Sequence, residues 1–319
     1  MANNPFIDIY ENDRYRNPYN YALVEFPYIL DIELTNNCNI DCIMCPRSIM
    51  TRKLGMMSFK LFKKIINEAA GYKTGIRFIR AGEPFLNKDI LKMIDYTKKK
   101  NLFCHVTTNG LVLTNELIIK VVTSGLDSII FSFQGTNRKE YELMRNNNQY
   151  DKLKEHIVFL KKVRDEQGSD TPFIQVSTSI LDETEEEIKQ FSEQWNMVAD
   201  RVDKWFTSLD RISHLPRVKK LLKRQSTLKY LSNAPCNEVA TKLSINWNGD
   251  VTACCSDFDG KLLLGNITDK SLKEIWKSKK INALRKILSR GERHKIPFCS
   301  LCLQDVKTHP RGKSIKATT

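Results

Sequence analysis

The sequence predicts an α/β fold: a partial TIM-like barrel of six β/α units, (β/α)6, followed by a small C-terminal α+β domain. Short runs rich in Ile, Val and Phe alternate six times with amphipathic stretches of helical period. Such alternation predicts a parallel sheet with crossover helices. Eight units close a complete barrel, so six predict an open one. The alternation stops after residue 210, where a different pattern begins.

The predicted strands and helices follow one another through residues 29–210. The six apolar runs interpreted as strands are 29–35, 75–80, 103–108, 128–133, 173–180 and 201–208. The amphipathic stretches between them, interpreted as helices, are 58–70, 88–100, 115–124, 150–167 and 183–198. Thr114 and Asp182 are expected to cap the helices that follow them, because their side-chain oxygens can accept a free backbone N–H. In such a barrel, ligands bind at the C-terminal ends of the strands.

The rest of the chain divides into four shorter parts. Residues 1–28 are an N-terminal extension, 211–233 a basic helical linker, and 234–305 the small domain. Within that domain, Asn248-Gly249 lies between two apolar runs, a strong hairpin signal that predicts strands over 243–247 and 250–254. A helix is predicted over 271–288. The polar, basic composition of 306–319 predicts a disordered tail.

Composition narrows the class of protein. The 319 residues, 41% of them hydrophobic, suffice for an ordinary core. No stretch approaches the ~20 apolar residues of a membrane span, and the N-terminus has no signal-peptide pattern. We therefore expect a cytoplasmic protein with no membrane partner. The net charge of +14 fits a solvated lysine-rich surface, an anionic substrate or nucleic acid. The sequence lacks the aromatic-interleaved basic stripe of a single-strand binder.

The nine cysteines are the strongest chemical signal in the chain. Disulfides are not expected in a cytoplasmic protein. Eight cysteines lie in two groups, within 38–45 and 236–302, and short spacers favour metal ligation. Cys104 stands apart within a predicted strand and is interpreted as a small core residue.

The first group, Cys38, Cys42 and Cys45, follows the first predicted strand as CxxxCxxC. Cysteine thiolates are the normal ligands of a [4Fe–4S] cluster. Three of them leave one iron without a protein ligand, and this open position makes an enzyme the first hypothesis. The alternative is a structural zinc site, which usually has four protein ligands; no fourth ligand is obvious nearby.

This motif, with four later segments, resembles the radical S-adenosylmethionine (SAM) superfamily. The supporting segments are Arg80-Ala81-Gly82-Glu83-Pro84, Thr107-Thr108-Asn109-Gly110, Ser132-Phe133-Gln134-Gly135 and Glu142-Leu143-Met144-Arg145. The resemblance covers about residues 28–303. It implies that SAM chelates the open iron and is cleaved reductively to a 5′-deoxyadenosyl radical, which removes a hydrogen atom from an unactivated carbon. The residues it assigns to SAM binding are Met44, Gly82, Glu83, Thr108, Asn109, Ser132 and Arg145.

Two positions depart from the family pattern. Ala81 replaces the first glycine of the GGEP segment, which receives the methionine amino group; an added methyl is a small change. Met44 stands where an aromatic residue usually covers the adenine, and a thioether can also pack on a ring face.

The second group, Cys236, Cys254, Cys299 and Cys302, resembles the SPASM/twitch extension of the same superfamily. Four ligands imply one fully coordinated auxiliary [4Fe–4S] cluster, the short twitch form; a zinc ribbon is the alternative. Its role would be electron acceptance or purely structural. Cys255 is a surplus thiol: a hydrogen-atom donor, a bystander, or the ligand in place of Cys254. In sulfatase-maturing relatives an aspartate base follows this cysteine, and its absence argues against that activity.

The resemblance implies a radical SAM oxidoreductase of dehydrogenase or epimerase type. A small polar, carbohydrate-like substrate, such as a phosphorylated or nucleotide-linked sugar, fits the short cysteine set. It also fits an N-terminal region too short for a leader-peptide domain. A flavodoxin- or ferredoxin-type protein would supply electrons. The catalytic candidates are Cys255, Arg80 and Gln134, and further strand-end candidates for substrate contact are Gln175 and Asp210.

Two alternatives remain open from the sequence. One is a peptide-modifying maturase of the same superfamily. The other is a metal-stabilised nucleic-acid-binding protein, which would leave the AGEP, TTNG and SFQG segments unexplained.

Overall fold

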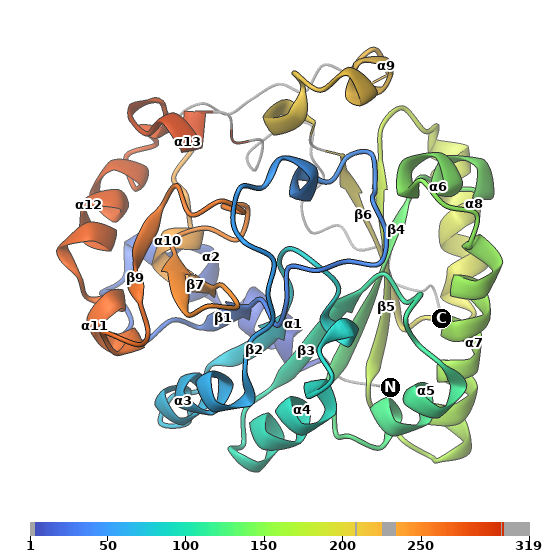
Figure 1. Cartoon of the computed structure of the whole chain (residues 1–319), viewed down its shortest axis with the longest axis horizontal. Helices are drawn as coiled ribbons and strands as arrows, with labels where there is room; N and C mark the ends of the chain where they lie inside the picture. Colours follow the sequence, from blue (N-terminus) through green and yellow to red (C-terminus); the bar gives the residue numbers. More distant parts are fainter. Residues whose placement is uncertain (1–3, 208, 225–233, 301, 303–319) are drawn as a thin grey trace.

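The computed structural model describes residues 4–207, 209–224, 234–300 and 302. These residues form one sheet with the strand order β6-β5-β4-β3-β2-β1-β7-β8-β9 (Figure 1). The barrel strands, each parallel to its neighbour, are β1 (Ile29–Ile32), β2 (Gly75–Phe78), β3 (Cys104–Thr108), β4 (Ser128–Gln134), β5 (Phe173–Ile180) and β6 (Arg201–Phe206). The predicted open barrel of six β/α units is confirmed.

Amphipathic helices cover the outer face of the barrel, as Figure 1 shows. They are α3 (Phe59–Ala69), α4 (Ile90–Lys99), α5 (Asn115–Val122), α7 (Tyr150–Glu166) and α8 (Glu185–Asn196). Thr114 caps α5 as predicted, accepting from the Leu117 N–H. The cap predicted at Asp182 is wrong: Thr184 caps α8, because Thr184 and Glu187 form a reciprocal capping box.

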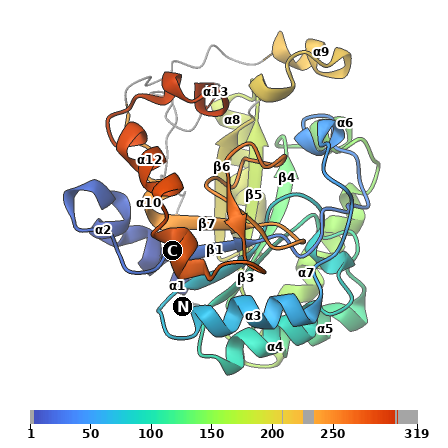
Figure 2. The same cartoon turned by 60° about the vertical axis from the view of Figure 1, so that its left-hand side comes forward.

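Two N-terminal helices, α1 (Pro5–Glu11) and α2 (Asp13–Arg16), were not predicted. The Phe6 ring meets the His105 ring edge-on at 5.5 Å between centroids. The Tyr10 hydroxyl accepts a hydrogen bond from Arg77 at 2.6 Å. Since His105 and Arg77 belong to β3 and β2, the N-terminal extension packs against these barrel strands. Figure 2 shows α1 beside β1.

The C-terminal part continues the barrel sheet. Strand β7 (Lys242–Ile245) pairs in parallel with β1, and β8 (Asp250–Thr252) and β9 (Leu263–Asn266) pair antiparallel beyond it. The hairpin at Asn248-Gly249 is as predicted, and Gly249 has a φ of +90°. The helices are α10 (Glu238–Thr241), α11 (Leu272–Trp276), α12 (Lys279–Leu288) and α13 (Pro297–Ser300). The single helix predicted over 271–288 is two helices, because Ser278 starts a new one as its N-cap.

Short helices complete the connections between these elements. Helix α6 (Arg138–Arg145) follows β4, and α9 (Lys219–Leu222) lies within the predicted linker. The 3₁₀ turns are η1 (Pro18–Asn20), η2 (Pro46–Ile49), η3 (Pro84–Leu86), η4 (Asp210–Ile212), η5 (Pro216–Val218) and η6 (Arg293–Lys295). The rest of the linker, 225–233, and the predicted tail, 306–319, lie outside the described residues.

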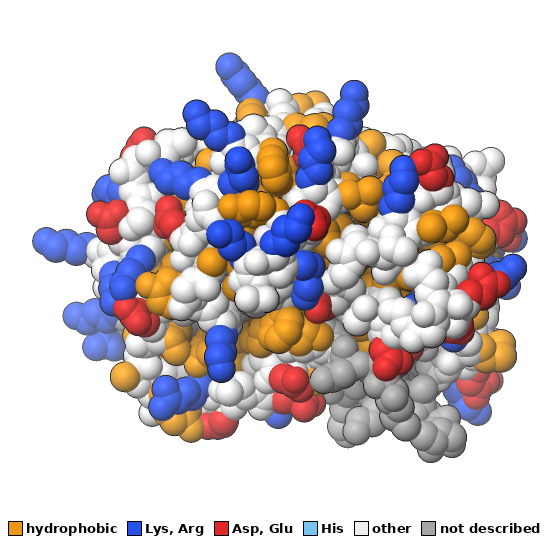
Figure 3. Space-filling model, turned by 90° about the horizontal axis from the view of Figure 1, so that it is seen from below, with side chains coloured by type: hydrophobic (Ala, Val, Ile, Leu, Met, Phe, Trp, Pro, Cys, Tyr) orange, Lys and Arg blue, Asp and Glu red, His pale blue; other side chains and the backbone are white. Residues whose placement is uncertain are grey.

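The helices and the surface charge bear on the possible partners of the chain. Across the described ranges, no helix combines the length and the apolar character needed to cross a membrane. On the face shown in Figure 3, basic side chains are interspersed with acidic and apolar ones.

Candidate active site and metal centres

The first cysteine group lies on the loop that leaves β1 at its C-terminal end. Cys42 is buried, and Cys38 and Cys45 are partly buried. Burial raises the pKa of the Cys38 and Cys45 thiols, that of Cys45 to about 11, and the neighbouring cysteines add to both shifts. Thiols in this setting become thiolates when a bound cation compensates their charge. Three such thiols on one loop therefore suit an iron–sulfur cluster.

Residues that follow two other strands, β3 and β4, hold this loop. The Asn109 amide donates to Asn39 Oδ1 at 2.8 Å and lies 3.7 Å from Cys38 Sγ. Arg145 lies 3.7 Å from Cys42 Sγ. The loop backbone is fixed by the Ile43 N–H, which donates to the Met144 carbonyl at 2.9 Å. The segments at the ends of β3 and β4 thus converge on the cysteine loop.

Glu83 ties the end of β2 to the end of β3. Its buried carboxylate accepts from Thr108 Oγ1 and from the Asn109 N–H, both at 2.7 Å. Burial raises the pKa of Glu83, while these hydrogen bonds oppose the shift. The Glu83 N–H in turn donates to the Asn37 carbonyl at 2.8 Å. Glu83 therefore orders the backbone around the first cysteine group.

Gly82 is required by close backbone contact. Its φ is +82°, and a Cβ there would lie 2.3 Å from the Thr35 oxygen and 2.6 Å from the Asn37 oxygen. No side chain fits without moving the start of the cysteine loop.

Arg145 and Ser132 lie beside the same loop. Arg145 is buried and donates to the Ser132 carbonyl. Its Nε has no hydrogen-bond partner in the described part of the chain. Met44, expected over an adenine ring, is partly buried and packs against a second apolar cluster beside the linker, which includes Met144, Leu209 and Ile212. Its predicted role in SAM binding stays a prediction.

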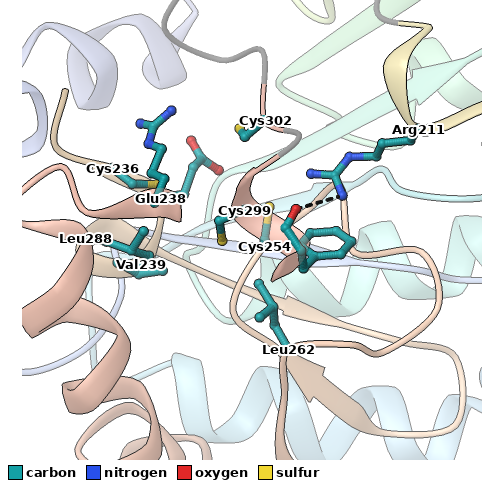
Figure 4. A pocket seen from close by; sticks show the side chains of 11 residues that line it. Arg211, Cys236, Glu238, Val239, Cys254, Leu262, Leu288, Cys299 and Cys302 are labelled. Carbon is teal, nitrogen blue, oxygen red and sulfur yellow. Dashed lines mark hydrogen bonds between the residues drawn. The ribbon is translucent and has the colours of Figure 1, made fainter. Parts of the chain in front are cut away.

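The second cysteine group lines one cavity (Figure 4). Cys236, Cys254, Cys299 and Cys302 all belong to its lining. Burial raises the pKa of Cys236 and of Cys299 to about 11. Among the described residues, no three His, Cys, Asp or Glu side chains are grouped to hold a single metal ion. Four thiols spread around a cavity suit a cluster of several atoms.

Cys254 and Cys255 face different surroundings. Cys254 is among the residues that line the cavity, whereas Cys255 is not. The Cys255 thiol lies 3.8 Å from a carboxylate oxygen of Glu238. The hydrogen bond between the two thiols raises the pKa of Cys254 and lowers that of Cys255. The place of Cys254 in the cavity lining favours it as the ligand, whereas the lowered pKa of the Cys255 thiol favours Cys255, so the assignment of Cys254 stays a prediction.

The candidate substrate residues differ in whether their polar atoms already have hydrogen-bond partners. Arg80, expected at the substrate, donates to the Cys254 and Asp257 carbonyls, so its guanidinium is engaged by the small domain. Gln134 keeps a buried Oε1 without a partner within the described ranges. Gln175 donates to the Asp203 carboxylate. The side chain of Asp210 lies outside the described residues.

Two arginines that matter for the site were missed from the sequence. Arg52 forms a two-point ion pair with Glu33, at 2.9 and 2.7 Å, and its Nε donates to the Phe258 carbonyl at 2.6 Å. Arg211 stacks over the Phe298 ring at 3.8 Å beside the second cysteine group. Their partners lie far away in the sequence, so no local spacing indicated either contact.

Two family models match the chain, one over the barrel and one over the small domain. The family model of the radical SAM superfamily matches residues 32–194. The model of the SPASM iron–sulfur cluster-binding domain matches residues 236–303.

Two curated relatives match over most of their length. One is a tungsten-containing aldehyde ferredoxin oxidoreductase cofactor-modifying protein of Pyrococcus furiosus, 25% identical, with 86% of each chain covered. The other is an S-adenosyl-L-methionine-dependent 2-deoxy-scyllo-inosamine dehydrogenase of Niallia circulans, 23% identical, covering 86% of this chain and 92% of the relative.

Two solved structures share the fold. BtrN in complex with AdoMet and 2-DOIA has a TM-score of 0.56 at 19% identity, covering 88% of this chain and 92% of that one. Streptococcus suis SuiB bound to S-adenosylmethionine has a TM-score of 0.66 at 15% identity, covering 95% and 78%.

Proposed function

The chain belongs to the radical SAM superfamily, with SAM, a SAM-binding [4Fe–4S] cluster and an auxiliary iron–sulfur cluster as cofactors, and from this premise we propose that it oxidises an alcohol of a small polar, carbohydrate-like molecule, or epimerises it. The observation that carries the substrate class is the polar inner face of the barrel. Similarity to the inosamine dehydrogenase over 86% of the chain supports the same class.

The inner face follows from the alternation of side chains along each strand. Val106, Phe131 and Val176 belong to the apolar core under the helices. Their neighbours in sequence therefore point into the barrel: Thr107, Ser132 and Gln175. Gln134 and Ser179 are paired on the same face at the C-terminal ends of β4 and β5. Hydroxyl and amide groups of this kind suit hydrogen bonding to a polyol.

The cofactor-holding residues surround this face. Cys38, Cys42 and Cys45 would hold the first cluster, and Cys236, Cys254, Cys299 and Cys302 the auxiliary one. When bound, the first cluster together with SAM would supply a 5′-deoxyadenosyl radical for hydrogen removal, and the auxiliary cluster would supply an electron acceptor for the oxidation. Arg145 and Asn109 would fix SAM against the first loop. Gln134, with its unpartnered Oε1, would orient a substrate hydroxyl.

The test uses the anaerobically reconstituted protein with SAM, a reductant and 2-deoxy-scyllo-inosamine as the probe. We expect 5′-deoxyadenosine and a product two hydrogens lighter, both followed by mass spectrometry. Deuterium at the reacting carbon should appear in 5′-deoxyadenosine. Cys38→Ala should abolish both products, while Cys104→Ala is the matched control because Cys104 is a buried core cysteine. Absence of 5′-deoxyadenosine with both clusters intact would refute SAM cleavage.

A Cys255 variant distinguishes epimerisation from dehydrogenation. In an epimerase, its thiol would return a hydrogen atom to the substrate, and the one-electron donor, of flavodoxin or ferredoxin type, would reduce the resulting thiyl radical as it takes up a proton. Cys255→Ser should then stop product formation while 5′-deoxyadenosine is still released. In a dehydrogenase, Cys255→Ser should leave the product ratio unchanged.

A peptide-modifying maturase is the second candidate. A mycofactocin maturase is 27% identical, but over only 40% of this chain. The matched 128 residues are too few to extend the likeness to the small domain, so this similarity supports the shared SAM chemistry more than a peptide substrate.

A further inference from the structure

Arg80 connects the two cysteine sites through a single residue. It lies on the loop after β2, two positions before Gly82. Its guanidinium donates to the Asp257 carbonyl at 2.8 Å, the Cys254 carbonyl at 3.2 Å and Thr252 Oγ1 at 3.4 Å. All three acceptors belong to β8 or to the loop that follows it. The side chain therefore hydrogen-bonds to the backbone of Cys254, which lines the cavity of the second cysteine group.

The backbone of Arg80 is strained where it makes this connection. Its φ is +140°, a region that side-chain-bearing residues rarely adopt. Glycine would occupy this conformation without steric cost. Strained residues persist where their surroundings determine them strongly, and they gather at functional sites. An arginine here indicates that the guanidinium contacts outweigh the strain.

The other end of the connection reaches the first cysteine loop. Two residues after Arg80, Gly82 packs against the carbonyl oxygens of Thr35 and Asn37. The Glu83 N–H holds the Asn37 carbonyl at 2.8 Å. A displacement of this segment when SAM binds would be transmitted to Arg80, and through its hydrogen bonds to Cys254.

We propose that Arg80 is a positioning residue that couples SAM binding to the reduction potential of the auxiliary cluster. The inference rests on the two clusters of the proposed function. Hydrogen bonding and the orientation of ligands set the potential of an iron–sulfur cluster. Coupling between two sites is reciprocal: SAM shifts the potential, and the redox state of the cluster shifts SAM affinity.

The test is a redox titration of the reconstituted holoenzyme, with and without SAM, followed by EPR. The Cys299→Ala variant, which loses an auxiliary ligand, identifies the signal of the first cluster. We expect SAM to shift the midpoint potential of the auxiliary cluster in the wild type. A tenfold coupling corresponds to about 59 mV for a one-electron couple.

Two Arg80 variants separate coupling from folding. Arg80→Gly removes the guanidinium and relieves the strained φ, while Arg80→Lys keeps the charge and loses the forked donor. We expect both to reduce the SAM-induced shift. The matched control is Asn101→Gly, which relaxes another positive φ, +56°, in the loop between α4 and β3. That variant should keep the wild-type shift.

Each outcome decides the proposal. Loss of the shift in both variants, with both clusters retained, supports it. A SAM-induced shift that is unchanged in Arg80→Gly overturns the proposal. The proposal is also overturned if SAM does not change the midpoint potential of the auxiliary cluster in the wild type. Loss of the auxiliary cluster from both variants indicates a purely structural role and also overturns it. A wild type without two clusters, or without SAM cleavage, contradicts the proposed function instead.

Discussion

Replacing Gly82 with alanine should break the contact between the loop after β2 and the first cysteine loop. The added Cβ would lie 2.3 Å from the Thr35 oxygen, 2.6 Å from the Asn37 oxygen and 2.8 Å from Asn36 Cα. All three are main-chain atoms, so no side-chain rotation can relieve the overlap. Overpacking typically costs about 1–3 kcal/mol, and the positive φ adds about 1–2 kcal/mol. We expect a total of about 2–5 kcal/mol.

Two other glycines separate these contributions. Gly168 has a φ of +59° and would place its Cβ with no atom within 4 Å, so Gly168→Ala measures the conformational cost alone. Gly71 has open space and no positive φ, so Gly71→Ala should change little. The free energy of unfolding from anaerobic urea titration gives all three values, and the rate of 5′-deoxyadenosine release tests the site. If Gly82→Ala costs no more than Gly168→Ala, the close-contact reasoning is wrong.

Two further predictions concern His105 and Arg145. Burial, with Arg77 adding, lowers the pKa of His105 to about 3. Because the unfolded chain binds this proton near pH 6.5, wild-type stability should fall as the pH drops below about 6.5. His105→Gln should remove about 1 kcal/mol of the loss between about pH 7 and about pH 5.5, measured by urea unfolding; equal losses in both proteins would contradict this. Arg145→Met should raise the KM for SAM by about 10- to 150-fold, since a charge-assisted hydrogen bond contributes about 1.5–3 kcal/mol. Arg138→Met, an exposed arginine on the same helix, should not, and equal effects would indicate general damage to α6.

The barrel could be predicted from the sequence because its strands are dense in β-branched and aromatic residues. Strand β5 has the predicted bounds, Phe173–Ile180. Helix α6 was missed because only Tyr141 and Met144 provide buried apolar side chains among its eight residues, too few for a periodic signal. Strand β9 has only two apolar residues, followed by Gly265 and Asn266, so it resembled a loop. Local pattern therefore located elements with dense or periodic apolar residues and missed those with few.

Part of the candidate site was located from the sequence, and part became visible only in the structure. The cysteines could be located from their spacing. The segments after β2, β3 and β4 were identified only by their resemblance to the radical SAM superfamily. The acceptors of Arg80 lie 172–177 residues away in sequence. No spacing therefore indicated that its guanidinium donates to the end of β8 and to the loop after it, residues 253–262, which we call the auxiliary loop. The sequence also left Cys254 and Cys255 as alternative ligands, because adjacent cysteines have the same spacing to the rest of the group.

The auxiliary loop is attached to the barrel at several points. Arg80 holds the Cys254 and Asp257 carbonyls from the end of β2. Arg52, paired with buried Glu33, holds the Phe258 carbonyl from the segment after the first cysteine group. Strand β7 also completes the sheet beside β1. Removing the small domain would expose the β1 edge and leave the Arg80 donors without their acceptors, so the two metal centres belong to one structural unit. This continuity lets a change at the SAM-binding segment reach the auxiliary cysteines without a moving domain.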